Sequence, residues 1–164
     1  MKIIQIAGYK NSGKTTFASL LIEKLTQSGF QVASLKHHGH GGAPIGIKST
    51  DSEKHRSSGA FLAGVEGDGV FQLSAQNPWR FSELTAIYEW FGTEVLIVEG
   101  FKKEPYPKIV TIGRKEDLPL LDELTNIQAV LTAIDLPYKD FPYPVFTRNE
   151  AEALCKWVCA KLQP

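Results

Sequence analysis

A glycine-rich stretch near the N-terminus has the residue types and the spacing of a phosphate-binding loop. Gly8 is followed, after four residues, by Gly13, Lys14 and Thr15. Glycines let the backbone approach an anion, so that the N–H groups from Lys10 to Thr15 can surround it, supported by the positive end of a following helix. A lysine at this position reaches the β- and γ-phosphates, and the next hydroxyl binds Mg²⁺. The pattern predicts a P-loop that binds a nucleoside triphosphate.

A second stretch, EVLIVEG at residues 94–100, ends a run of apolar residues with an acid. Consecutive apolar β-formers predict a buried strand, so Glu99 lies at a strand's carboxyl end, in the Walker B arrangement that holds Mg²⁺ directly or through water. Gly100 leaves backbone room beside the γ-phosphate. The alternative is an ordinary strand ending in a solvated glutamate, but the P-loop strand available for pairing favours the metal-binding interpretation.

Asp51 stands at the start of another predicted helix and has two candidate roles. Thr50 or Asp51 can cap that helix, because a short oxygen-bearing side chain accepts from the first free N–H groups. Many P-loop NTPases also place a carboxylate after the second strand, near Mg²⁺ or the attacking water. The sequence leaves both roles open, and one residue can serve both. The candidate catalytic residues are therefore Lys14, Asp51 and Glu99, and the candidate metal ligands are Thr15, Glu99 and Asp51.

Asp135 ends the sequence TAID, after a late predicted strand. Guanine-specific P-loop proteins often carry Asn/Thr-Lys-x-Asp at a comparable place, where the aspartate bonds the guanine edge. The aspartate is present in this chain, whereas the lysine that packs over the base is missing, so the support for guanine is weak. The candidate nucleotide-binding residues are Gly8, Lys10, Asn11, Ser12, Gly13, Lys14, Thr15, Thr16, Gly100 and Asp135.

Three histidines, His37, His38 and His40, follow the second predicted strand in a glycine-rich segment. A zinc site would need ligands at an accepted spacing, and neither a nearby cysteine nor a fourth ligand meets that need. Histidine can also donate to a phosphate or face a partner. A solvated loop without a special role is the third interpretation.

Alternating strands and helices must position these residues. Strands are expected at residues 2–7, 31–36, 94–100, 108–112 and 127–132, and helices at 14–28, 50–59 and 81–91, with a last helix that begins in a capping box of Asn149 and Glu152. This order predicts an α/β fold, namely a P-loop NTPase three-layer fold with a mostly parallel sheet. A strand, turn and strand at about residues 60–73 predict an added β-hairpin with few charges, which indicates an oligomer contact. Residues 1–164 are expected to form one nucleotide-binding domain.

Two local expectations are more detailed. In the helix at residues 81–91, Ser82 is the expected N-cap, and the expected apolar face comprises Leu84, Ile87, Tyr88 and Phe91. The charged stretch from Gly113 to Asn126 is expected to be irregular.

Composition narrows the classes of partner. The chain of 164 residues carries 18 Lys plus Arg and 18 Asp plus Glu, so its net charge offers no electrostatic reason to expect nucleic acid or an anionic membrane. No apolar run is long enough to span a bilayer, and the N-terminus enters a strand directly. Cys155 and Cys159 are expected to be reduced, packed thiols, which predicts a cytoplasmic location.

Several of these motifs occur together in one known family. The segments are GYKNSGKTT, SLKHHGH, the helix start TDS, the strand entry Gly59-Ala60 and VLIVEGFK, in this order. The chain thereby resembles the molybdopterin-guanine dinucleotide biosynthesis adaptor proteins of the MobB type, over nearly its whole length.

The resemblance implies a GTP-binding protein that hydrolyses GTP weakly and is often a homodimer. Such proteins assist the guanylyltransferase that attaches GMP to molybdopterin, so the implied partners are that enzyme, a second copy and, as a further candidate, molybdopterin. Carried over by position, residues 8–16 would bind the phosphates, Thr15 and Glu99 would lie near Mg²⁺, and Asp51 would lie near the γ-phosphate.

The alternative function is a P-loop kinase for a small molecule or a nucleotide. Such kinases share the phosphate loop but normally add a lid with clustered arginines. The arginines of this chain, Arg56, Arg80, Arg114 and Arg148, are scattered singly. Their spacing disfavours a kinase lid and predicts slow hydrolysis without a partner.

Overall fold

The computed structural model describes residues 1–38, 50–136 and 140–163. The chain divides into two compact units. The larger unit comprises residues 1–37 and 86–164, and the smaller comprises residues 38–85. The larger unit contains the phosphate-loop sequence and the strand that ends in Glu99.

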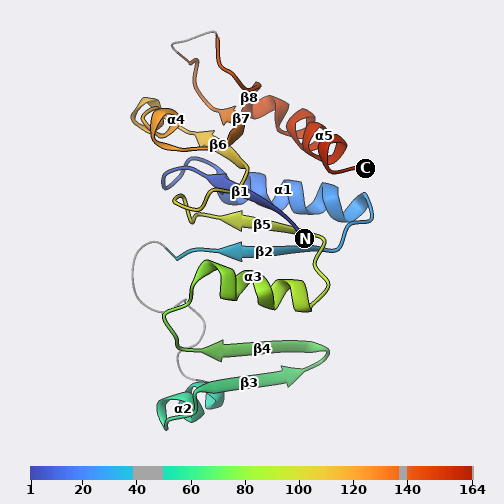
Figure 1. Ribbon diagram of the computed structural model, residues 1–164, viewed down its shortest axis with the longest axis vertical. Helices are drawn as coiled ribbons and strands as arrows, with labels where there is room; N and C mark the ends of the chain where they lie inside the picture. The colour runs from blue at the N-terminus through green and yellow to red at the C-terminus, as the bar shows by residue number, and fades with distance from the viewer. Residues whose placement is uncertain (39–49, 137–139, 164) are drawn as a thin grey trace. The chain divides into compact units, whose positions relative to one another are not determined.

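Parallel strands form the sheet of the larger unit, in the order β2-β5-β1-β6-β7-β8 (Figure 1). They are β1 (Lys2–Ala7), β2 (Val32–Lys36), β5 (Val95–Glu99), β6 (Lys108–Ile112), β7 (Ile127–Thr132) and β8 (Val145–Thr147). Because all the pairs are parallel, the carboxyl ends of the strands share one edge. At that edge Glu99 lies opposite both Ile6 of β1 and Lys36 of β2.

Apolar side chains cover both faces of this sheet, as expected for parallel strands. The helices α1 (Lys14–Gln27) and α5 (Ala151–Leu162) pack on one face, where Leu21 and Leu154 join Ile109 in a buried cluster. The neighbouring residue Val110 points the other way and joins the cluster of Leu120, in the short helix α4 (Leu120–Glu123). The remaining turns are the 3-10 segments η1 (Lys115–Asp117) and η2 (Arg148–Glu150).

The smaller unit contains the helix α2 (Asp51–Ser57) and an antiparallel hairpin of β3 (Leu62–Gly67) and β4 (Val70–Ala75). Asp68 and Gly69 join the two strands with φ of 51° and 75°, as a two-residue type I′ turn requires. The helix α3 (Phe81–Trp90) continues from this unit into the larger one, where the Tyr88 hydroxyl donates to the Ser34 carbonyl at 2.9 Å.

The α/β fold, the parallel sheet and the separate hairpin confirm the predicted fold class. Two predictions about α3 were wrong. The helix begins at Phe81, so Ser82 lies inside it, and Phe91 lies just beyond its end with 66% of its surface exposed. Within the described residues, no helix combines the length and the apolar character needed to cross a membrane.

Two predictions about the later part of the chain also need correction. The capping box before α5 is formed by Thr147 and Glu150 rather than by Asn149 and Glu152. It follows the short strand β8, which the sequence pattern did not predict. The stretch expected to be irregular contains η1 and α4, because the buried carboxylate of Asp117 accepts from the N–H groups of Gly113 and Arg114 and turns the chain there.

Candidate functional site

The phosphate-loop sequence connects β1 to α1 at the carboxyl edge of the sheet. Asn11 and Gly13 adopt left-handed conformations, with φ of 66° and 95°, and thereby turn the loop back over the start of the helix. Gly13 is the N-cap of α1, and it has no side chain with which to satisfy the free N–H groups of the first turn. That turn also lacks an acidic residue. The positive end of a 14-residue helix is therefore available to an anion.

The loop is packed closely against β6. A Cβ on Gly8 would lie 2.2 Å from Oγ1 of Thr111 and 2.4 Å from Oγ of Ser12, so only glycine fits. These two hydroxyls, both buried, form a hydrogen bond of 2.7 Å. The bond ties the middle of the loop to the neighbouring strand and holds the loop's shape without a ligand.

Lysine ammonium groups approach the loop from two directions. Nζ of Lys14 donates to the Tyr9 carbonyl at 2.6 Å, and Nζ of Lys102 lies 3.9 Å from the centre of the Tyr9 ring. Burial lowers the pKa of Lys14, an effect that Glu99 opposes, and burial also lowers the pKa of Lys102. A bound anion would compensate for the lost hydration of both ammonium groups. Lys10 and Thr16 are exposed on the same loop and helix start.

The predicted metal ligands Thr15 and Glu99 are in contact. The Thr15 hydroxyl donates to both carboxylate oxygens of Glu99, at 3.0 and 3.1 Å. A hydroxyl and a carboxylate are hard oxygen ligands, and Mg²⁺ in nucleotide sites is commonly held by one or two such groups together with phosphates and water. The donor chemistry of this pair therefore fits Mg²⁺. Lys36 also reaches the pair, with Nζ 3.0 Å from Oε1 of Glu99 and 3.1 Å from Oγ1 of Thr15.

Gly100 directly follows this carboxylate and lies against the second strand's end. A Cβ there would come within 2.9 Å of the His37 Cβ. The His37 ring in turn contacts the Phe101 ring, with centroids 4.8 Å apart. The buried amide of Gln5 holds this turn by donating to the Phe101 carbonyl at 2.8 Å. His40 lies outside the described residues, and within them no cluster of three or more His, Cys, Asp or Glu residues could hold a metal ion.

The other two predicted acids, Asp51 and Asp135, are described by their local surroundings. Thr50 is the N-cap of α2, because its hydroxyl accepts from the Glu53 N–H at 3.3 Å. Asp51 belongs to the smaller unit, where its carboxylate pairs with Lys54 at 2.8 Å. Asp135 is exposed, three residues beyond the end of β7. The capping role predicted for Thr50 or Asp51 therefore belongs to Thr50, whereas the role of Asp51 near Mg²⁺ or the attacking water and the role of Asp135 at the guanine edge stay predictions.

Sequence reasoning missed two basic residues of this site. One is Lys36, described above. The other is Arg148, whose guanidinium donates to the Ser12 carbonyl at 3.2 Å and would meet a Cβ on Gly13 at 3.4 Å. Both residues stand at or just after the carboxyl end of a strand, β2 and β8. Ligands of α/β proteins bind at the carboxyl ends of strands, so the position of Lys36 at the end of a predicted strand was a signal that could have found it. No such signal was available for Arg148, because β8 was not predicted.

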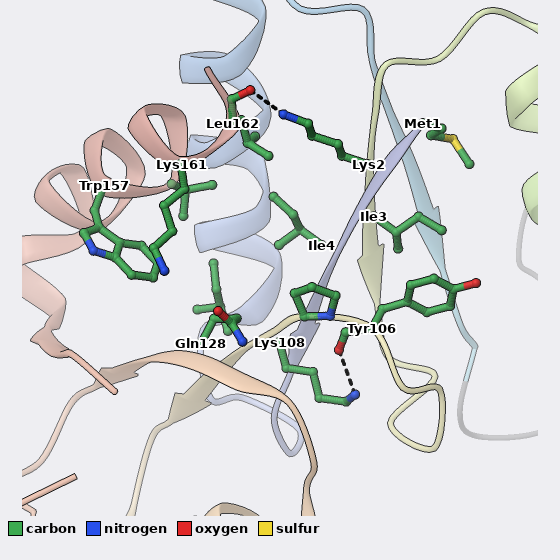
Figure 2. A pocket seen from close by; sticks show the side chains of 13 residues that line it. Met1, Lys2, Ile3, Ile4, Tyr106, Lys108, Gln128, Trp157, Lys161 and Leu162 are labelled. Carbon is green, nitrogen blue, oxygen red and sulfur yellow. Dashed lines mark hydrogen bonds between the residues drawn. The ribbon is translucent and has the colours of Figure 1, made fainter. Parts of the chain in front are cut away.

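An apolar cavity of about 390 Å³ lies at the opposite edge of the sheet (Figure 2). It is lined by the first residues of β1 and β6 and by the last turns of α5, including Ile4, Trp157 and Leu162. Nζ of Lys161 lies over the Trp157 ring at 4.2 Å, on the rim. Because the phosphate loop follows the carboxyl end of β1, this cavity belongs to a different part of the unit.

Comparison with known proteins gives a consistent result. The family model described as molybdopterin guanine dinucleotide synthesis protein B matches residues 3–133. A probable molybdopterin-guanine dinucleotide biosynthesis adapter protein of Bacillus subtilis is 43% identical over 79% of this chain and 75% of its own length. The corresponding adapter protein of Haemophilus influenzae is 31% identical over 74% of this chain and 70% of its own. The crystal structure of Bacillus subtilis MobB, 35% identical, superimposes with a TM-score of 0.85 and 99% coverage of both chains.

Proposed function

The chain belongs to the molybdopterin guanine dinucleotide synthesis protein B family, and on this premise we propose that it is a GTP-binding accessory protein with weak GTPase activity, which assists the attachment of GMP to molybdopterin. The contact between Thr15 and Glu99 beside the uncapped start of α1 is the observation that carries the proposal. This contact places the two side chains that would hold a nucleotide-bound Mg²⁺ next to the N–H groups at the start of α1 that would bind a phosphate.

In this proposal the N–H groups of the loop bind the β-phosphate, and Lys14 exchanges its bond to the Tyr9 carbonyl for one to a phosphate oxygen. Lys102 adds positive charge at the mouth of the site. Thr15 and Glu99 would hold Mg²⁺, which would neutralise part of the triphosphate's negative charge. Asp51 orients the attacking water, and Asp135 bonds the guanine edge.

Hydrolysis in this proposal is slow, because fast hydrolysis at such sites normally needs an arginine that stabilises the transition-state charge. The Arg148 guanidinium is bonded to the Ser12 carbonyl and supports the loop rather than reaching across the phosphates. In this proposal the guanylyltransferase performs the chemistry on molybdopterin, and this chain assists it.

Calorimetric titration of GTP and of ATP, each with and without Mg²⁺, tests the nucleotide part of the proposal. We expect Mg²⁺-dependent binding that prefers GTP, and its loss in Lys14→Ala. Lys156→Ala is the matched control, because Lys156 is an exposed lysine of α5. Preference for ATP, or binding of neither nucleotide, would contradict the nucleotide part of the proposal. The adaptor part is tested by adding the protein to a purified molybdenum cofactor guanylyltransferase, where product formation should rise.

The hairpin supports a further part of the proposal, that the protein is a homodimer. Both faces of the two-stranded hairpin expose apolar side chains, with Leu62, Phe71 and Leu73 on one face and Val65 and Val70 on the other. Val70 is 68% exposed and Phe71 58%. Apolar exposure of this kind on a two-stranded hairpin marks an interaction surface, and in this proposal a second copy covers part of it. Light scattering of the purified protein measures its molar mass, which for a homodimer is twice that of one chain.

A further inference from the structure

Lys36 contacts both of the predicted metal ligands, which also contact each other. It is the last residue of β2 and lies opposite Glu99, the last residue of β5, in the parallel register. Its ammonium lies 3.0 Å from Oε1 of Glu99 and 3.1 Å from Oγ1 of Thr15. The hydroxyl and the carboxylate are themselves 3.0–3.1 Å apart. Three groups therefore share one small volume, and the positive charge within it comes from the protein itself.

The hydrogen bonds define what a metal ion would have to displace. The Thr15 hydroxyl uses its proton on Glu99 and accepts from Lys36 with a lone pair. Oε1 of Glu99 accepts from both neighbours. A Mg²⁺ ion bound directly to Oε1 and to Oγ1 would compete for the lone pairs that Lys36 uses. A divalent ion and an ammonium about 3 Å apart also repel each other strongly outside bulk water. The ammonium must leave before a metal ion can bind there.

The position of Lys36 permits such a departure. Its side chain is 58% exposed, whereas that of Glu99 is 12% exposed. The ammonium can thus swing away on its four-carbon stem without opening the core. The backbone beneath it stays fixed, because the His37 N–H donates to the Glu99 carbonyl at 2.9 Å.

We propose that Lys36 is a built-in competitor of Mg²⁺: its ammonium holds Thr15 and Glu99 together when no metal is present and supplies positive charge to a metal-free nucleotide. The inference rests on the proposed nucleotide function and adds a residue that sets the metal dependence of binding. Nucleotide binding is then still tighter with Mg²⁺ than without it, but the difference is smaller than it would be without Lys36, and the metal must displace Lys36.

The test compares the wild type with Lys36→Met, which keeps the length of the stem and removes the charge. Lys156→Met is the matched control, since it removes a charge from an exposed position on α5. The dissociation constant of a non-hydrolysable GTP analogue is measured by calorimetry in saturating Mg²⁺ and in EDTA. We expect the ratio of the EDTA value to the Mg²⁺ value to rise on the order of tenfold in Lys36→Met, the scale of one lost charge-assisted hydrogen bond. The Mg²⁺ concentration at half-saturation should fall, and the control should match the wild type.

The outcomes separate the two proposals. A wild type that binds no nucleotide in either condition removes the proposed function and this inference with it. A wild type that binds, with an unchanged ratio in Lys36→Met, overturns the inference alone. Equal loss of affinity in both conditions also overturns it, because Lys36 would then bind phosphate irrespective of the metal. Lys36→Gln, which is polar and neutral, must give the same ratio as Lys36→Met, and thermal unfolding shows that each variant is folded.

Discussion

Replacing Gly8 by alanine should destabilise the larger unit by an amount that can be worked from the packing of the phosphate loop. The new Cβ would lie 2.2 Å from Oγ1 of Thr111, 2.4 Å from Oγ of Ser12 and 2.9 Å from the Thr111 carbonyl oxygen. One of these atoms belongs to the backbone, the other two are hydroxyls bonded to each other, and both residues are buried. The loop must therefore move away from β6.

Two costs add in this variant. Overpacking a close contact costs about 1–3 kcal/mol. Separating the Ser12 and Thr111 hydroxyls removes a buried hydrogen bond of 2.7 Å, which contributes about 1 kcal/mol. The total is about 2–4 kcal/mol, and at about 2–4 °C per kcal/mol for a chain of this size the melting temperature should fall by about 4–16 °C.

Thermal unfolding followed by circular dichroism measures this change. Gly67→Ala is the matched control, because a Cβ there meets no atom within 4 Å. Its free energy of unfolding should stay within about 0.5 kcal/mol of the wild type. If Gly8→Ala melts at the temperature of the wild type and of the control, the loop is not packed against β6 as described.

Three further predictions concern other parts of the molecule. Arg148→Met should weaken binding of a GTP analogue about fivefold, because the Ser12 carbonyl loses a donor worth about 1 kcal/mol. Calorimetry measures this affinity, and an unchanged value would count against the role of Arg148 in supporting the loop. Burial raises the pKa of Cys155 from 9.0 to about 12, so this thiol stabilises the fold below pH 9 and loses that contribution as the pH rises toward 12. Urea unfolding at several pH values should show this fall in the free energy of unfolding in the wild type and not in Cys155→Ala. An equal change of the unfolding free energy with pH in both proteins would refute the prediction. Val70→Asp should convert the proposed dimer to a monomer by placing a charge on an apolar contact, and light scattering would contradict this by returning an unchanged mass.

The errors in sequence-based prediction came from competing local signals. Asn149 and Glu152 have the spacing of a capping box, but Thr147 and Glu150 have it too, and the structure uses the earlier pair because β8 ends at Thr147. Phe91 fits the helical period of α3, yet α3 ends at Trp90 and leaves Phe91 outside. Periodicity identifies a face of a helix but does not place the residue at which the helix ends.

The sequence by itself determined those features that depend on local preferences. The predicted phosphate loop, with glycine at its close contact and at the helix start, needs only the conformational freedom of glycine and the absence of a Cβ. Buried parallel strands follow from runs of apolar residues, and the α1 helix from its spacing and from the glycine that ends it. These features are set within a few residues of chain, so the pattern alone predicts them.

Only the tertiary structure decided which side chains surround the site. Lys36 meets Glu99 because β2 pairs with β5, a neighbour that is not next in the chain, and that register places the ends of the two strands side by side. Arg148 reaches Ser12 across a separation of 136 residues because α5, which follows Arg148, packs beside α1 on one face of the sheet. Contacts of this kind depend on strand order and helix packing, which arise from burying the whole core at once rather than from the preferences of any single segment.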